Sequence, residues 1–186
     1  FITSTNENDI TNINPDNITI TATGNYAGAI IGYAKWSNYQ IEQKIKNILI
    51  QNSNITGQDY VGGVLGYGRV NQMEGINNHI KGNSYVGGIT GNAYTKNGNA
   101  TTRNSIIEGT GDRIGGIAGY HNSLFNVHVY DSKIYGTGSK SNYVGGIGGY
   151  GQSSVMYGLV EDSDISTSGS YVGGINGYRG SCISAV

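Results

Sequence analysis

The chain has 186 residues, which suits one domain, and its net charge is −1, with no cluster of Lys and Arg to suggest a nucleic-acid-binding surface. Cys182 is the single cysteine, so a disulfide framework is excluded, and no apolar run is long enough for membrane insertion. Gly accounts for 32 residues and Pro for one, without a G-X-Y period, which excludes a collagen-like rod.

The N-terminal part differs from the rest of the chain. Residues 1–21 precede the first repeat and are expected to form a partial coil or a cap. Residues 38–49 contain no Gly and are the best candidate for a helix. Nowhere, however, do apolar residues recur for long at the spacing of a helix face, so the sequence as a whole favours strands.

An octad rich in Gly, Val, Ile and Tyr recurs six times. The copies occupy residues 26–33, 60–67, 85–92, 113–120, 143–150 and 171–178, and their first residues are 25 to 34 positions apart. Recurrence at such a period is typical of stacked structural units. Residues 22–186 are therefore predicted to form a repeat array, which stops part-way through a repeat at the C-terminus.

A second recurring segment follows the octads. Apolar and polar residues alternate in residues 48–57, 76–82, 127–136 and 159–166, and β-branched types dominate there, as expected of strands. One coil of short strands cannot bury its own apolar face, whereas stacked coils can, with equivalent strands about 4.8 Å apart. The sequence thus predicts an all-β, parallel β-solenoid with coils of about 25–34 residues.

The Gly-Gly pair of each octad separates two apolar positions. Val61 and Val64 are three residues apart, and a flat strand would place them on opposite faces. A bend at the pair would turn both inward, and Asn176 in the last octad is expected to face solvent. We therefore assign a structural role to these pairs, which are Gly62, Gly63, Gly87, Gly88, Gly115, Gly116, Gly145, Gly146, Gly173 and Gly174.

Tyrosines occupy the ends of the octads. Ten of the 15 Tyr are first or last octad residues, so stacking predicts one aromatic column through Tyr60 and Tyr85 and a second through Tyr67, Tyr120, Tyr150 and Tyr178. The columns are expected to contribute packing energy. The alternative is a platform for a sugar ring or a partner protein, with Tyr67, Tyr120, Tyr150 and Tyr178 as candidate binding residues.

The sequence offers no catalytic or metal-binding set. The three histidines, His79, His121 and His128, lack Cys or carboxylates at zinc spacing and are expected on solvated loops or edges. The densest acidic cluster, Glu161, Asp162 and Asp164, has no Arg or Lys beside it in the same coil and is interpreted as a solvated strand edge. No catalytic residue, metal or other cofactor is therefore predicted.

The octads at residues 143–150 and 171–178 resemble the GLUG motif, a repeat of large bacterial surface and secreted proteins. It occurs in immunoglobulin A protease-type zinc metallopeptidases and in filamentous adhesins. The resemblance covers residues 22–186, with departures at Ala27, Ala29, Asn92 and Arg113. It implies an extracellular bacterial β-solenoid segment, with any metallopeptidase chemistry elsewhere, because no His-Glu-x-x-His is present here.

Three functions follow from these observations. The first hypothesis is a non-catalytic spacer in a longer cell-surface or secreted protein, whose neighbouring domains are its partners. The second is an adhesin-type module that contacts a host glycan or protein through the tyrosine columns or edge loops. A carbohydrate-active β-helix enzyme is the third. The incomplete last repeat also predicts end-to-end self-association of this fragment.

Overall fold

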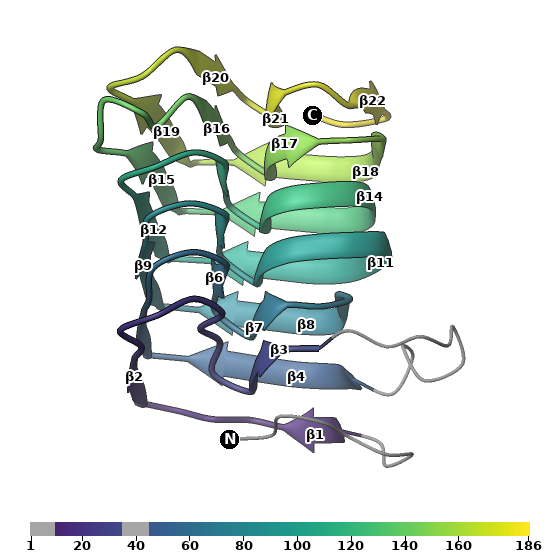
Figure 1. The fold of residues 1–186 in the computed structure, drawn as a ribbon. Helices are drawn as coiled ribbons and strands as arrows, with labels where there is room; N and C mark the ends of the chain where they lie inside the picture. Colours follow the sequence, from purple (N-terminus) through teal and green to yellow (C-terminus); the bar gives the residue numbers. More distant parts are fainter. Residues whose placement is uncertain (1–9, 35–44) are drawn as a thin grey trace.

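The computed structural model describes residues 10–34 and 45–186 and contains strands but no helix in these ranges. Figure 1 shows the strands stacked in successive coils. Every strand pairing is parallel, and the strands form sheets of eleven, six and five members. The predicted all-β, parallel β-solenoid is confirmed.

Each sheet collects the strands of one side of the coils. The six-stranded sheet contains β2 (Thr19–Thr21), β5 (Asn54–Thr56), β9 (His79–Gly82), β12 (Ile106–Gly109), β15 (Lys133–Gly136) and β19 (Asp164–Thr167). The five-stranded sheet contains β6 (Val61–Gly62), β10 (Val86–Gly87), β13 (Ile114–Gly115), β16 (Tyr143–Gly145) and β20 (Tyr171–Gly173).

The eleven-stranded sheet wraps around the remaining side. It contains β1 (Ile10–Ile13), β3 (Ile31–Tyr33), β4 (Ile45–Gln51), β7 (Leu65–Tyr67), β8 (Asn71–Ile76), β11 (Thr90–Arg103), β14 (Ala118–Tyr130), β17 (Gly148–Gly151), β18 (Ser154–Glu161), β21 (Asn176–Tyr178) and β22 (Ser181–Ile183).

The candidate helix over residues 38–49 is not formed in its described part. Residues 45–49 belong to strand β4, which pairs with β1 on one side and with β8 on the other. Ile45, Ile48 and Ile50 are buried, because the coils above and below supply both backbone partners and apolar contacts. Residues 38–44 lie outside the described residues.

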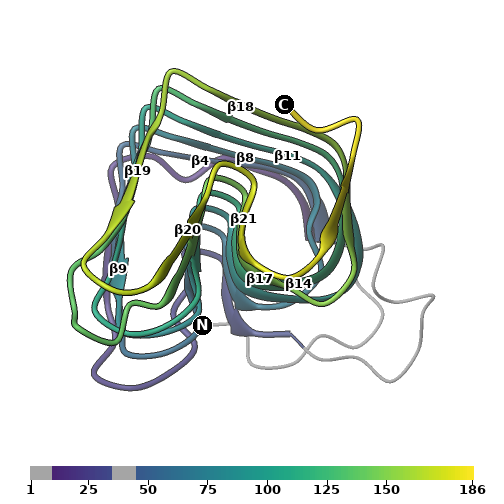
Figure 2. The same cartoon turned by 90° about the horizontal axis from the view of Figure 1, so that it is seen from above.

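Each octad folds into a finger inside the coil. In residues 60–67, β6 and β7 are separated by a bend at Gly63 and Val64. Figure 2 shows the equivalent strands β20 and β21 side by side in the middle of the last coil. Val61 and Val64 are both fully buried, and Val86 pairs with Val61 and with Ile114 in the adjacent coils. The bend therefore turns both apolar positions into the core.

Close approach of backbones explains the glycines of the finger. A Cβ on Gly63 would overlap the carbonyl oxygen of Gly88 in the next coil, and a Cβ on Gly66 would lie 2.7 Å from the carbonyl oxygen of Tyr60 in the opposite arm. Among the described glycines, Gly180 is the one with a positive φ, at 76°. These octad glycines are thus needed for the space that the next coil or the opposite arm leaves them, whereas the sequence suggested a need for unusual backbone angles.

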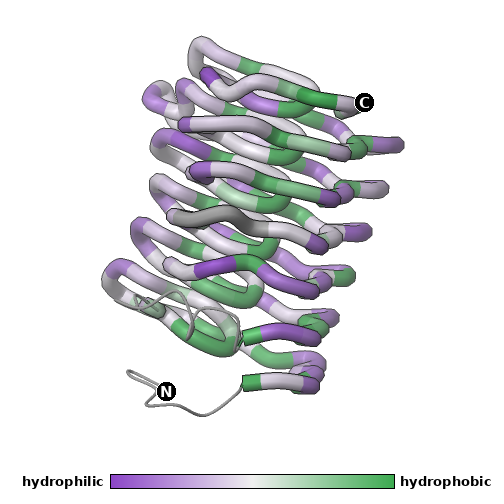
Figure 3. The backbone as a smooth tube through the Cα atoms, turned by 90° about the vertical axis from the view of Figure 1, so that its right-hand side faces the viewer, coloured by the Kyte–Doolittle hydropathy of each residue, from purple (hydrophilic) through white to green (hydrophobic). Residues whose placement is uncertain are grey.

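Two corners of the coils are built by residues with positive φ angles. The first corner, with φ of 50–58°, consists of Asn12, Asn47, Gln72, Asn99, Asn126 and Tyr157. The second, with φ of 47–55°, consists of Asn17, Asn52, Asn77, Asn104, Asp131 and Asp162. Asn and Asp tolerate this conformation better than most residues, which accounts for eight Asn residues at these corners. Figure 3 shows hydrophilic residues recurring at the bends of successive coils.

A polar ladder directly follows the second corner. Its members are Ser53, Asn78, Ser105, Ser132 and Ser163. The Ser105 N–H donates to Ser132 Oγ at 3.2 Å, and Ser132 Oγ donates to the Tyr130 carbonyl at 2.6 Å. Each side chain therefore satisfies a backbone N–H that the turn removes from the strand ladder, and all members except Ser163 are buried from water.

Replacement of Ser132 by Ala is expected to lower the free energy of unfolding by about 1–3 kcal/mol, because the buried Ser105 N–H loses its acceptor. Ser163→Ala is the control, since Ser163 is more exposed and water can replace its hydroxyl. Urea denaturation measures both. An equal effect of the two substitutions would contradict the role of burial.

Candidate functional site

Tyrosine rings gather at the mouth of the octad fingers. Tyr26, Tyr60 and Tyr85 stack along the solenoid axis, with ring centroids 4.8 and 4.4 Å apart. Each has a positive φ, as does Arg113, the next residue in this position, with values of 57–65°. Such angles are unusual for bulky residues, so the surrounding coils impose them at the point where the chain enters the finger.

The predicted second column is present but divided. Tyr67 stacks on Tyr94 at 4.9 Å, whereas Tyr120 stacks on Tyr150 at 5.5 Å, and Tyr150 lies 5.5 Å from Tyr178. Sequence reasoning missed Tyr94. Tyr94 follows Asn92 by two residues, and side chains with this spacing lie on the same face of a strand. This spacing could have placed Tyr94 in the column.

A groove of about 550 Å³ opens where the columns are interrupted. We call it the Tyr–Arg groove, and its lining residues are Tyr67, Tyr85, Asn92, Tyr94, Arg113, Tyr120, Tyr150, Gln152 and Arg179. Three of the four predicted binding tyrosines thus line one groove. The fourth, Tyr178, contacts Tyr150 and the guanidinium of Arg179 beside it.

Two guanidinium groups give the groove a positive charge. The Arg113 Cζ atom lies 4.5 Å from the Tyr85 ring centre and 5.2 Å from that of Tyr150. Arg179 lies 5.8 Å from the Tyr150 ring centre. None of the lining residues, all in the described part of the chain, is acidic. Cation–π contacts therefore hold both charges without neutralising them.

Two phenols of the groove, Tyr67 and Tyr120, have raised pKa values. Burial raises the pKa of Tyr67, and the neighbouring Tyr33 raises it further. Burial also raises the pKa of Tyr120, as does Tyr150, although the Arg113 charge opposes the shift. Both phenols can therefore donate and accept hydrogen bonds at neutral pH.

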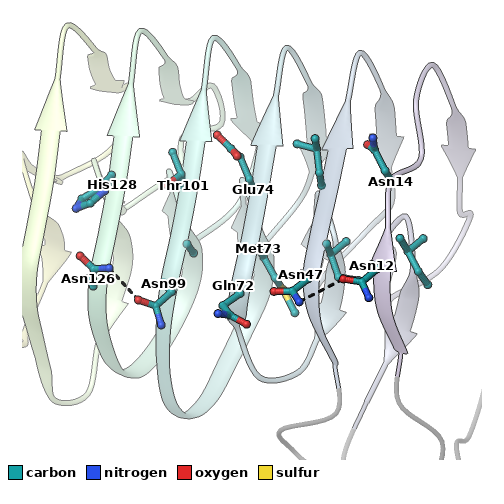
Figure 4. Close-up of a pocket in the computed structure, with 14 residues that line it drawn as sticks. Asn12, Asn14, Asn47, Gln72, Met73, Glu74, Asn99, Thr101, Asn126 and His128 are labelled. Atoms are coloured by element: carbon teal, nitrogen blue, oxygen red, sulfur yellow. Dashed lines mark hydrogen bonds between the residues drawn. The ribbon is translucent and has the colours of Figure 1, made fainter.

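A second groove, of about 520 Å³, crosses the outer face of β1, β4, β8, β11 and β14. Figure 4 shows amide side chains of the first corner along one side of it. Asn126 Nδ2 donates to Asn99 Oδ1 at 2.8 Å, and Asn47 Nδ2 donates to Asn12 Oδ1 at 3.3 Å. These four amides hydrogen-bond to one another in pairs, and the positive φ angles of the corner explain why Asn occurs there. The polar residues along this groove are therefore explained by the fold without a ligand.

His121 and Asn176 are exceptions to the expected exposure of polar residues. His121 is fully buried, and its Nε2 lies 2.9 Å from Asn176 Oδ1, so Asn176 points toward His121 and not toward solvent. The two residues lie two coils apart, which no local pattern reveals. Burial lowers the pKa of His121 and keeps the ring neutral at pH 7.

The remaining polar residues that the sequence singled out lie at an exposed bend or in an ion-pair cluster. The acidic cluster of Glu161, Asp162 and Asp164 is exposed at the bend between β18 and β19. His79 Nε2 lies 3.4 Å from Glu108, which also pairs with Lys81 at 3.0 Å. Within residues 10–34 and 45–186, no group of three His, Cys, Asp or Glu could hold a metal ion.

Comparisons of the chain with protein-family models, with curated proteins and with solved structures give no match. A search of the described residues also finds no helix that could cross a membrane.

Proposed function

We propose that this chain is a non-catalytic spacer segment of a large bacterial surface or secreted protein. The observation that carries this proposal is the continuity of its ladders. Three parallel sheets and the polar ladder of Ser53 to Ser163 link each coil to the next. The resemblance of its octads to the GLUG motif supports the extracellular, bacterial placement.

Continuous ladders make the stack stiff along its axis. Each coil contacts mainly its neighbours, so length can change by whole coils without altering the remaining contacts. A segment of this kind holds neighbouring domains of the same protein at a defined distance.

A two-coil deletion in the parent protein tests the spacer role. Removal of residues 85–142 joins Ser84 to Tyr143, which reproduces the Asn142–Tyr143 junction in register and shortens the stack by about 10 Å. Surface display and activity toward soluble substrates should persist, while reach to surface-bound substrates should change. Loss of folding or of activity toward soluble substrates would contradict a spacer role.

A second candidate function is binding of a host glycan or protein through the tyrosine columns. The Tyr–Arg groove favours it, because a purely structural column has no need of an interruption lined by two cations. Binding on a glycan array that requires Tyr120 would support this candidate. Turnover of polysaccharides by the isolated chain would instead favour the enzyme hypothesis and contradict both proposals.

We also propose that copies of this chain associate end to end. Val172 belongs to the ladder of Val61 and Val144 but is 49% exposed, because no further coil covers it in this structure. A second copy stacked on this coil would bury Val172 and pair its strand edges. An apparent mass from light scattering that rises with concentration supports this association, and a chain that stays monomeric at high concentration refutes it.

A further inference from the structure

Two departures from the tyrosine pattern meet in the Tyr–Arg groove. The first octad residue is Tyr in five copies and Arg113 in the fourth, and the last is Tyr in five copies and Asn92 in the third. These two residues belong to adjacent coils, in which Val86 pairs with Ile114 and Asn92 pairs with Tyr120. The two exceptions to the tyrosine pattern are 21 residues apart in the sequence, but both line the Tyr–Arg groove.

The two departures present hydrogen-bonding groups without partners. Arg113 Nε and Asn92 Oδ1 are buried, and neither has a hydrogen-bond partner within the described residues. A buried donor or acceptor without a hydrogen-bond partner lowers the stability of the fold, and a ligand that binds these two side chains would offset that loss. One is a charged donor and the other is a neutral acceptor, so a fitting ligand carries an anionic group and a hydroxyl or N–H donor close together.

We propose that the Tyr–Arg groove binds a carboxylate-bearing sugar, a hexuronic acid unit of a glycan. Its carboxylate would pair with the guanidinium groups of Arg113 and Arg179. Its hydroxyls would exchange hydrogen bonds with the Asn92 amide and with the phenols of Tyr67 and Tyr120. The volume of about 550 Å³ is in the range of small-molecule sites.

A sugar acid fits this groove better than an acidic peptide. The lining combines aromatic rings with phenol and amide groups that both donate and accept, which matches a ligand with many hydroxyls on a compact ring. This inference rests on the binding role proposed second above and is independent of the spacer role.

NMR titration of the intact chain with a glucuronic-acid-containing disaccharide tests the proposal. We expect saturable shifts of Tyr and Arg113 resonances, and at least tenfold weaker binding of the methyl ester, which keeps the hydroxyls but lacks the charge. Raised ionic strength should also weaken binding of the acid. Equal affinity for acid and ester, or no shifts at millimolar concentrations, would overturn the proposal.

Arg113→Tyr is the matched variant, because it installs the residue that Tyr60 and Tyr85 provide with the same backbone angles. It should keep the thermal stability and lose at least tenfold in affinity for the acid. Asn92→Tyr, which restores the other position, should also weaken binding. Unchanged affinity in both folded variants refutes this site.

Arg103→Ala is the control for a general charge effect. The Arg103 guanidinium lies 4.3 Å from the Tyr130 ring centre but does not line the groove. Its removal should leave binding unchanged, and a tenfold loss would count against the site.

Tighter binding of a Glu-rich peptide than of the disaccharide would refute the ligand class but leave a binding role for the tyrosine columns. If binding on the glycan array requires Tyr120 but not Arg113, the sugar-acid site is refuted and only the general binding role of the tyrosine columns remains.

Discussion

Replacement of Ile147 by Asp is expected to unfold several coils of the solenoid at room temperature. Ile147 is fully buried at the tip of an octad finger. Its N–H donates to Ile175 and its carbonyl accepts from Ile117, so it is fixed between two coils. An unpaired carboxylate there costs several kcal/mol, which is a large part of the about 5–15 kcal/mol that stabilises a typical domain.

Thermal unfolding followed by circular dichroism measures this effect, with Ile106→Asp as the control. Ile106 also lies in a strand, β12, but its side chain is 36% exposed and faces outward. The control should melt within a few degrees of the original chain. A similar melting temperature for both variants would place Ile147 outside the core.

The repeat made the architecture predictable. Recurring octads fixed which residues stack, because equivalent positions of identical coils must pair, and the buried ladder through Val61, Val86 and Ile114 follows directly. Alternation of apolar and polar residues predicted the strands, which needs no knowledge of distant contacts. Residues 45–49 were a helix candidate on local composition alone, because their composition does not reveal the pairing of β4 with its neighbours.

Features that depend on adjacent coils were less predictable. The Asn-Ser and Asp-Ser pairs at the second corner recur in the sequence, but their role requires that Ser132 lie beside the Ser105 N–H. The contact between His121 and Asn176 spans two coils. The groove, likewise, depends on where two unrelated departures from the repeat fall in space, which the coil register decides.

Replacement of Gly146 by Val is expected to lower the free energy of unfolding by at least about 3 kcal/mol, at the upper end of the cost of overpacking. A Cβ on Gly146 would overlap the carbonyl oxygen of Gly174 and lie 2.9 Å from side-chain atoms of Ile165 and Val160. The carbonyl cannot move away freely, because the Gly146 N–H donates to Gly173 at 3.1 Å. The coil above would have to separate from the coil below.

Gly174→Val is the matched control, because Gly174 holds the same octad position one coil later and a Cβ there meets no atom within 4 Å. Its cost should stay within about 1 kcal/mol, as for ordinary surface substitutions. Urea denaturation of both variants separates the two explanations of the glycine pair. If the need is for space between stacked backbones, the Gly146 variant alone is strongly destabilised. If the need is for backbone angles, both variants lose stability equally, because the two glycines occupy equivalent bends.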